Sequence, residues 1–208
     1  MGRSSAGASA RRRVLPRGFY ERATLSVTAD LIGKVLVHRT PEGVTAGAIV
    51  EAEAYIGESD PACYAAPGPT ARNAPLYGPP GVAYVYLNYG MHYLVNAVTE
   101  GRGHPAAVLI RALEPLEGIP IMRRNRGIER LGDLARGPGR LTAALQVDRR
   151  LDGINLCREG PLWLGHDDHE PGEIGQSIRI GISRDTKRLL RFYLRGSSFV
   201  SGPRSLNG

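Results

Sequence analysis

Cysteine and lysine are scarce in this chain, and no stretch of it is apolar over the length of a membrane span. The two cysteines, Cys63 and Cys157, lie far apart and form no paired framework. Free thiols are typical of proteins in a reducing compartment. Because no secretory signal is recognisable either, we expect a cytoplasmic protein that does not enter a membrane.

The only lysines are Lys34 and Lys187, so nearly all of the 27 basic residues are arginine. The codon usage of a G+C-rich genome produces such a skew, which says nothing about function by itself. Basic residues outnumber the 20 acidic ones and give a net charge of +7. A positive charge favours a polyanionic partner and bears on association rather than on the fold.

A length of 208 residues suits one well-cored domain and is short for two. Residues 1–17 contain five arginines and no acidic residue, so we expect a disordered basic tail there. Such a tail is either without consequence or an arm that adds non-specific affinity for nucleic acid. We therefore predict a disordered tail over residues 1–17 and a single domain over residues 18–208.

Two acidic residues stand out in the first part of the domain. A helix through residues 28–32 and strands over 34–39 and 44–55 are expected, and Glu51 and Glu53 share one face of the second strand with Tyr55. A polar strand face is ordinarily the solvated side of a sheet, although two carboxylates beside a phenol could also line a site. The segment that follows, residues 57–81, is rich in Pro, Gly and Ala and is unusually long, so it is either a functional loop or a disordered one.

Residues 83–96 contain four of the nine tyrosines and alternate on either side of a turn at Tyr89. This pattern predicts a β-hairpin with a tyrosine at its tip. Tyr84 and Tyr93 are interpreted as half-buried strand residues, because tyrosine is common in strands. A tip tyrosine, in contrast, leaves a large ring in water, so we expect a partner into which the ring of Tyr89 inserts.

Arg111 interrupts an apolar run over residues 106–113 that is typical of a strand buried on both faces. A buried guanidinium needs an anionic partner. We expect Arg111 either to pair internally, with Glu51, Glu53 or Glu114, or to face an anionic ligand. Either alternative brings it close to the acidic strand.

The remaining elements expected are helices over residues 116–126 and from 141 onwards, and strands over 177–183 and 190–195. Residues 137–140, GPGR, precede the second helix, where free N–H groups could receive a phosphate or simply begin a helix. The run His166-Asp167-Asp168-His169 has metal-binding side chains but lies in a polar loop, so we expect no metal there.

Ordered blocks of this sequence resemble the alkyladenine (3-methyladenine) DNA glycosylase family: EAEAYIG at 51–57, ARN at 71–73, YVYLNYGMHYLVN at 84–96, LIRALEPLEG at 109–118, GPGRL at 137–141 and LRFYLRGSSFVSG at 190–202. The resemblance implies a single mixed α/β (α+β) domain, with a curved, mainly antiparallel β-sheet flanked by helices and a protruding tyrosine-tipped hairpin. It also implies that no metal or organic cofactor is required.

The activity implied by the resemblance is that of a monomeric, nucleoid-associated hydrolase of base excision repair. Such an enzyme flips an alkylated or deaminated purine, such as 3-methyladenine or hypoxanthine, out of double-stranded DNA and hydrolyses its N-glycosidic bond. Glu53 matches the catalytic glutamate that takes a proton from water, and Glu51 is the weaker candidate. Arg111 matches an arginine that helps hold this water and a neighbouring phosphate, and the main-chain carbonyl of Ile180 would also hold the water. Because no lysine falls in the implied pocket, we expect no lyase step and an abasic site as product.

Other positions match base-binding and intercalating residues of the family. Tyr55 and Tyr86 match the rings on which the flipped base stacks, and such stacking is worth about 1–3 kcal/mol per base. Asn96 matches an asparagine that crowds the exocyclic amine of guanine. Tyr89, with Met91 beside it, matches the wedge that fills the vacated place in the stack.

The chain departs from the family at Tyr64, because a DPxxH segment is usual where this sequence has DPACY. Tyrosine can stack on a base and donate a hydrogen bond, but it does not titrate near neutral pH as histidine does. The arginine-rich RGR that commonly follows is replaced by APGP at 66–69. Both changes bear on substrate range and phosphate contacts, and neither removes the expected base.

Two other functions stay open on the sequence. The change at Tyr64 would also suit a protein that recognises damaged or single-stranded nucleic acid without cleaving it, although Glu53 and Arg111 are retained. Glu51 and Glu53 could instead form the acid and base pair of an O-glycoside hydrolase, but a positive net charge suits DNA better than a neutral sugar. Release of a neutral purine needs a proton donor, and the sequence shows none.

Overall fold

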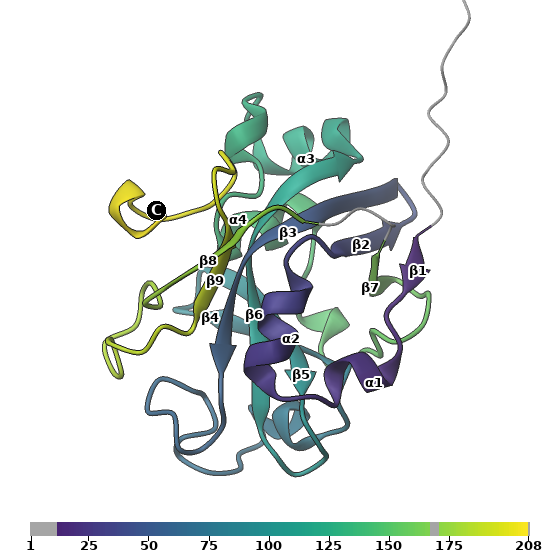
Figure 1. Cartoon of the computed structure of the whole chain (residues 1–208). Coiled ribbons are helices and arrows are strands. Elements are labelled where there is room, and N and C mark those ends of the chain that lie inside the picture. Colours follow the sequence, from purple (N-terminus) through teal and green to yellow (C-terminus); the bar gives the residue numbers. More distant parts are fainter. Residues whose placement is uncertain (1–11, 167–170, 208) are drawn as a thin grey trace, which may run out of the picture.

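The structure, a computed structural model, describes residues 12–166 and 171–207 (Figure 1). The strands within these residues are β1 (Arg13–Val14), β2 (Val35–Thr40), β3 (Gly43–Tyr55), β4 (Ala83–Asn88), β5 (His92–Thr99), β6 (Ala106–Glu117), β7 (Leu162–His166), β8 (Ile174–Ser177) and β9 (Arg191–Leu194). The α-helices are α1 (Arg17–Tyr20), α2 (Thr24–Leu31), α3 (Ile119–Arg126) and α4 (Pro138–Leu145).

All nine strands of the described chain belong to one curved, antiparallel sheet with helices packed around it (Figure 1). The strand order is β1-β7-β2-β3-β6-β5-β4. The long strand β3 pairs with β6 along one edge, and its other edge is shared by β2 in the first half and β9 in the second. The predicted single α+β domain with a curved antiparallel sheet is therefore confirmed.

The two-residue period of the strands gives the sheet two different faces. On one face, side chains such as Val85, Val95 and Ile110 pack against helices α2 and α4 and form the main core. On the other face, the residues that alternate with them, such as Tyr86 and Leu109, pack against the segment over residues 57–81. Helices cover the first face, so the second is the one that can carry an open site.

Strand β6 and helix α3 differ from their predicted bounds. The sequence places the strand end at Glu114-Pro115 and a helix from residue 116, but the strand continues to Glu117. Pro115 is opposite Gly47, next to a register shift, and such an irregularity accommodates a residue that lacks an N–H donor. Gly118, with φ +72°, then separates the strand from the helix.

Two further predictions from the sequence are corrected. Residues 178–183 are not a strand, because β8 ends at Ser177 and the polar groups that follow are used by other parts of the molecule. Residues 12–17 are not a tail: β1 pairs with β7, and Leu15 is only 3% exposed within the core. The expected disorder of residues 1–11 falls outside the described residues, as do Asp167, Asp168 and His169.

Candidate active site

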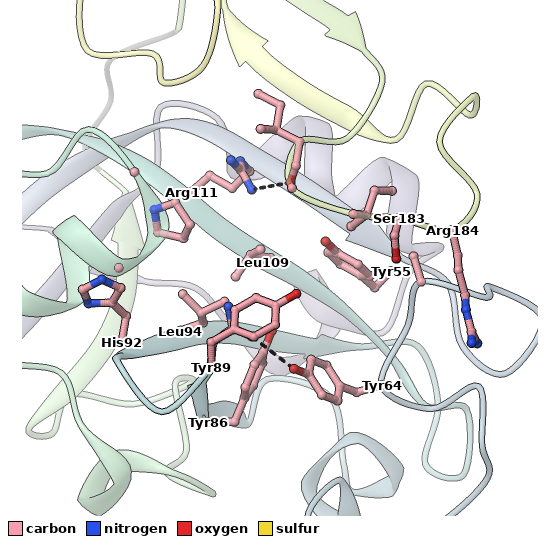
Figure 2. A pocket seen from close by; sticks show the side chains of 18 of the residues that line it. Tyr55, Tyr64, Tyr86, Tyr89, His92, Leu94, Leu109, Arg111, Ser183 and Arg184 are labelled. Carbon is pink, nitrogen blue, oxygen red and sulfur yellow. Dashed lines mark hydrogen bonds between the residues drawn. The ribbon is translucent and has the colours of Figure 1, made fainter.

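A cavity of about 600 Å³ opens on the face of the sheet opposite α2 (Figure 2). Its walls come from segments far apart in the sequence: the ends of β3 and β4, the middle of β6, the start of α4 and residues 180–184. The lining includes four tyrosines, namely Tyr55, Tyr64, Tyr86 and Tyr89, and three arginines, of which Arg111 lies deepest in the sheet. Aromatic walls with cationic groups suit a planar ligand attached to an anionic chain.

Glu53 lies directly behind this cavity and is completely buried. Its carboxylate accepts hydrogen bonds from the Ile180 N–H at 2.7 Å, from the Tyr55 hydroxyl at 3.0 Å and from Arg111 Nη1 at 3.2 Å. Burial raises the pKa of Glu53, and the charge of Arg111 and the Ile180 N–H only partly oppose this effect. A carboxylate with a raised pKa is a stronger base than an exposed one.

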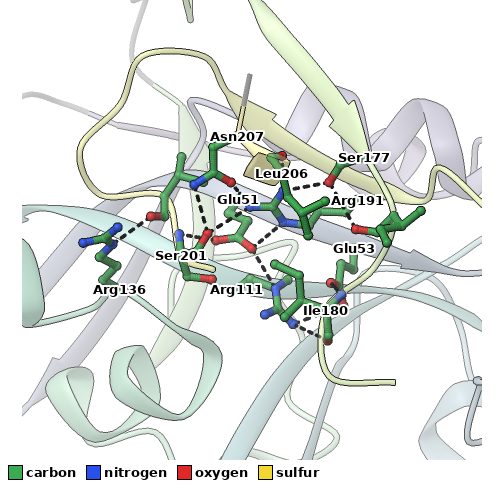
Figure 3. Close-up of polar contacts among 12 residues, drawn as sticks. Glu51, Glu53, Arg111, Arg136, Ser177, Ile180, Arg191, Ser201, Leu206 and Asn207 are labelled. Atoms are coloured by element: carbon green, nitrogen blue, oxygen red, sulfur yellow. Dashed lines mark hydrogen bonds and ion pairs between the residues drawn. The ribbon is translucent and has the colours of Figure 1, made fainter. Parts of the chain in front are cut away.

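Arg111 is the centre of a buried polar cluster (Figure 3). Its Nε donates to Glu51 at 2.8 Å, and its Nη1 reaches Glu53 and the Ile180 carbonyl at 3.2 and 3.3 Å. The internal pairing expected for Arg111 is confirmed, because it pairs with Glu51 and Glu53, and its side chain also lines the cavity. The solvated-face interpretation of the two glutamates is wrong, since neither is exposed.

Glu51 has a different environment from Glu53, although both lie on β3. It accepts hydrogen bonds from Arg111, from Arg191 Nε at 2.7 Å and from the Ser201 N–H at 2.7 Å. Burial raises the pKa of Glu51, but the two arginines outweigh it and hold the pKa below the usual value. Glu51 is thus a fixed anion that orients cations, whereas Glu53 is the more basic group of the pair.

Arg191 is not among the site residues predicted from the sequence, and its side chain is fully buried within this cluster. Besides Glu51, this guanidinium binds the Ser177 hydroxyl at 2.7 Å and the side chain of Asn207 at 2.8 Å (Figure 3). It thereby ties β8 and the C-terminal segment to the acidic strand. The only sequence signal was an arginine in an otherwise apolar strand, the same signal that identified Arg111.

Three tyrosines, Tyr55, Tyr64 and Tyr86, form aromatic walls of the cavity, and the ring of Tyr64 packs against that of Tyr86 (Figure 2). Their ring centroids are 4.4 Å apart, and the Tyr64 hydroxyl donates to Asn88 Oδ1 at 3.2 Å. Tyr55 stands on the other side of the opening, beside Glu53. Burial raises the pKa of Tyr55, so its hydroxyl stays protonated and can donate to the carboxylate.

Asn96 does not line the main cavity. It lies in a smaller space of about 20 Å³ behind the tyrosines, where Tyr84 and Tyr86 also contribute to the wall. Its side-chain amide donates to the Tyr84 carbonyl at 3.0 Å, which fixes its orientation. The smaller space shares Tyr55, Tyr64 and Tyr86 with the main cavity, so these rings lie between the cavity and Asn96.

Tyr89 and Met91 lie in the short connection between β4 and β5. They are among the most exposed large apolar side chains described, at 82% and 70%. The main chain of Tyr89 adopts a left-handed conformation with φ +49°. Its side chain is part of the cavity lining, whereas that of Met91 is not. The exposure of both leaves them available to a partner.

Cationic groups surround the opening of the cavity. Arg140, at the start of α4, and Arg184 line it, and the guanidinium of Arg72 lies 5.1 Å from the ring of Tyr64. Neither Lys34 nor Lys187 is part of the lining.

Within residues 12–166 and 171–207, no group of three or more His, Cys, Asp or Glu side chains is placed to hold a metal ion. The helices of that same part of the chain are too short or too polar to cross a membrane.

The sequence of this chain matches a known protein family over most of its length. Residues 18–198 match the family described as methylpurine-DNA glycosylase. The chain belongs to the methylpurine-DNA glycosylase family. Membership makes it a DNA glycosylase, a hydrolase of base excision repair, and confirms the resemblance found in the sequence.

Relatives of this glycosylase occur in bacteria and archaea. A protein from Mesorhizobium japonicum is 60% identical over 183 residues, which are 88% of each chain. Proteins from Rubrobacter xylanophilus and Methanocella arvoryzae are 51% and 49% identical, cover 86% and 90% of this chain, and are themselves covered to 93% and 96%. All three carry the name "Putative 3-methyladenine DNA glycosylase".

Proposed function

We propose that this glycosylase acts as a monomer on double-stranded DNA, flips a methylated purine, 3-methyladenine foremost, into the tyrosine-lined cavity, and hydrolyses its N-glycosidic bond with Glu53 as general base. One observation supports this assignment above all others. The most basic carboxylate of the site lies directly behind an aromatic pocket, where it accepts hydrogen bonds from a cation and from a main-chain N–H.

Base flipping has a cost of about a few kcal/mol, which contacts with the protein must offset. Tyr55 and Tyr86 provide rings for the flipped base, and stacking contributes about 1–3 kcal/mol per base. The exposed ring of Tyr89, with Met91 beside it, fills the place that the base leaves. Asn96 faces the smaller space behind these rings, and we assign to it the crowding of a purine that carries the exocyclic amine of guanine.

The hydrolysis needs a water held against the sugar. The Glu53 carboxylate and the Ile180 carbonyl are both acceptors, and Arg111 holds the two together. As the water oxygen bonds to C1′, its proton passes to Glu53, and the electron pair of the breaking C–N bond goes to the base. The carboxylate also opposes the positive charge that develops on the sugar.

A base that is already cationic takes up this electron pair and leaves as a neutral purine. Hypoxanthine is neutral and needs a proton as it leaves, and no carboxyl group lines the described cavity to supply one. The imidazole in the lining, that of His92, lies across the opening from Tyr55 and Tyr64 (Figure 2). Tyr64 offers only a phenol where the family usually has histidine. We therefore expect slower release of hypoxanthine than of 3-methyladenine.

The product is an abasic site in an intact strand, because no lysine lines the cavity to form a Schiff base.

The test is single-turnover base release by wild type and by Glu53→Gln on matched duplexes that contain 3-methyladenine, hypoxanthine or undamaged adenine. Glu42→Gln, the same change at an exposed glutamate, is the matched control. We expect release of 3-methyladenine by wild type and the control, and loss of release with unchanged DNA binding in Glu53→Gln. Binding without release by the wild type would instead favour a damage-recognition protein.

A further inference from the structure

Arg179 is a buried cation that contacts Tyr55, one of the rings of the candidate site. Its side chain is completely buried, and its guanidinium lies 4.7 Å from the centre of the Tyr55 ring. Two parallel hydrogen bonds of 2.5 and 2.8 Å join it to Asp60, and a third of 3.0 Å reaches the Ala54 carbonyl. A bidentate arginine–carboxylate pair fixes the plane of the guanidinium as well as its position.

These contacts join three segments that build the site. Ala54 and Tyr55 end strand β3, and Asp60 belongs to the loop that carries Tyr64. The residue after Arg179 is Ile180, whose N–H and carbonyl bind the Glu53 carboxylate and Arg111. The side chain of Arg179 thus contacts the Tyr55 ring directly. The next residue in the chain, Ile180, binds both Glu53 and Arg111 through its main chain.

Asp60, which holds the Arg179 guanidinium, is itself fixed by the surrounding main chain. It is fully buried, and its carboxylate accepts main-chain N–H groups of Ile56 at 3.3 Å and Ala62 at 3.1 Å. Burial raises the pKa of Asp60, but Arg179 and these donors outweigh it and keep the pKa below its usual value. The pair therefore stays charged over the neutral range.

Arg188 shows which of these contacts are special to Arg179. It also contacts Asp60, at 3.3 Å, and Asp185, at 2.6 Å, but its side chain is 37% exposed. None of its described polar contacts involves Tyr55 or the main chain of β3. Both arginines bind Asp60 and Asp185, whereas the contacts with the Tyr55 ring and the Ala54 carbonyl are made by Arg179.

We propose that Arg179 is a positioning residue that sets the placement of the Tyr55 ring relative to Glu53 and Ile180, so that a base stacked on Tyr55 presents its sugar carbon to the water. The inference rests on the proposed function of the site. Misplacement of reacting groups by about 1 Å can lower a rate 100-fold, so such a residue affects the chemical step without contacting substrate.

The position of Ile180 also affects the pH dependence of the rate, because its N–H binds the Glu53 carboxylate. The charged or titratable groups around Glu53 are Arg111 from β6, Glu51 and Tyr55 from β3, and Arg191 of β9 through Glu51. Burial raises the pKa of Glu53, and the Ile180 N–H is one of the groups that lower it. Displacing Ile180 should therefore raise the pKa further and move the acidic limb of the rate profile to higher pH.

The experiment compares Arg179→Lys and Asp60→Asn with the matched control Arg188→Lys. Single-turnover release of 3-methyladenine is measured at saturating enzyme from acidic to neutral pH, with DNA affinity and thermal stability in parallel. For Arg179→Lys we expect a rate loss of about tenfold or more, an acidic limb at higher pH and unchanged DNA affinity. Arg188→Lys should keep the wild-type rate and profile.

A rate and a pH profile like wild type in Arg179→Lys, or an equal loss in Arg188→Lys, would overturn the proposal. Should Arg179→Lys fail to fold, Asp60→Asn carries the comparison, since it weakens the fork and keeps the guanidinium. The amide resonance of Ile180, followed by NMR against pH without DNA, reports the ionisation of Glu53 independently of activity. If wild type releases no base, the proposed function fails, and an unchanged midpoint of this resonance in the variants still decides against Arg179.

Discussion

The two glutamates of β3 should respond in opposite ways to the same conservative change. Glu51 lies between Arg111 and Arg191, and all three side chains are almost completely buried. In Glu51→Gln the two guanidinium groups lose the anion that they share. Removing one partner of a buried ion pair costs about 3–5 kcal/mol. For a chain of this size, 1 kcal/mol shifts the melting temperature by about 2–4 °C, so we expect a decrease of roughly 6–20 °C.

Glu53→Gln should not be destabilising to a comparable degree. Burial raises the pKa of Glu53, which means that its charged form is less favourable in the folded protein than in the unfolded chain. A neutral amide of the same size removes this penalty, and Arg111 keeps Glu51 as its partner. We therefore expect an inactive variant whose free energy of unfolding at neutral pH equals or exceeds that of wild type, as is common when a catalytic group is replaced.

Linkage between protonation and folding fixes the sign of the pH dependence. The pKa of Glu51 is lowered in the folded state, so its stabilisation is complete above the unfolded pKa and is lost as pH falls through the folded pKa. The pKa of Glu53 is raised, so its effect is absent at low pH and becomes destabilising as pH rises from the unfolded towards the folded pKa. The stability of Glu53→Gln relative to wild type should therefore increase over that range.

Urea unfolding of wild type and both variants at several pH values measures these differences, and single-turnover base release on a 3-methyladenine duplex measures activity. Glu42→Gln again controls for the loss of a carboxylate. A strong loss of stability in Glu53→Gln, or none in Glu51→Gln, would refute the division of roles between the two residues.

Four further outcomes follow from the site and the fold. Tyr89→Ser should weaken duplex binding and base release at an unchanged melting temperature, because the exposed ring contributes nothing to the core; unchanged release would exclude a wedge. Affinity for duplex DNA, measured by titration, should fall steeply with salt, by about 0.9 log units per log unit of salt for each phosphate contacted, and a flat response would contradict phosphate binding. Deleting residues 1–11 should leave the saturated rate unchanged, whereas deleting 1–17 also removes β1 and the buried Leu15 and should lower the free energy of unfolding by at least about 1.5–3 kcal/mol in urea titrations. Tyr64→His should make hypoxanthine release increase below a pH of about 6.5 without affecting release of 3-methyladenine, and identical pH profiles would show that the position donates no proton.

Local patterns predicted the part of the fold that depends on neighbouring residues. Alternation in β3 and in β4 and β5 placed the strands, and the apolar run of β6 marked a strand in the middle of the sheet. The predictions failed where distant parts of the chain decide. Residues 178–183 alternate like a strand, but the side chain of Arg179 and the main chain of Ile180 bind Asp60 and Glu53 instead of an adjacent strand. Leu15 follows an arginine-rich stretch, and only the pairing of β1 with β7 buries it.

The roles of Glu51 and Glu53 show the same limit within one strand. Both have the same side chain, the same strand face and the same partner, Arg111, so no local property of the sequence separates them. What separates them is the second set of neighbours. Glu51 receives a further guanidinium from Arg191, 140 residues away, whereas Glu53 receives only uncharged donors. An additional cation turns one carboxylate into a permanent anion, and its absence leaves the other basic enough to accept a proton.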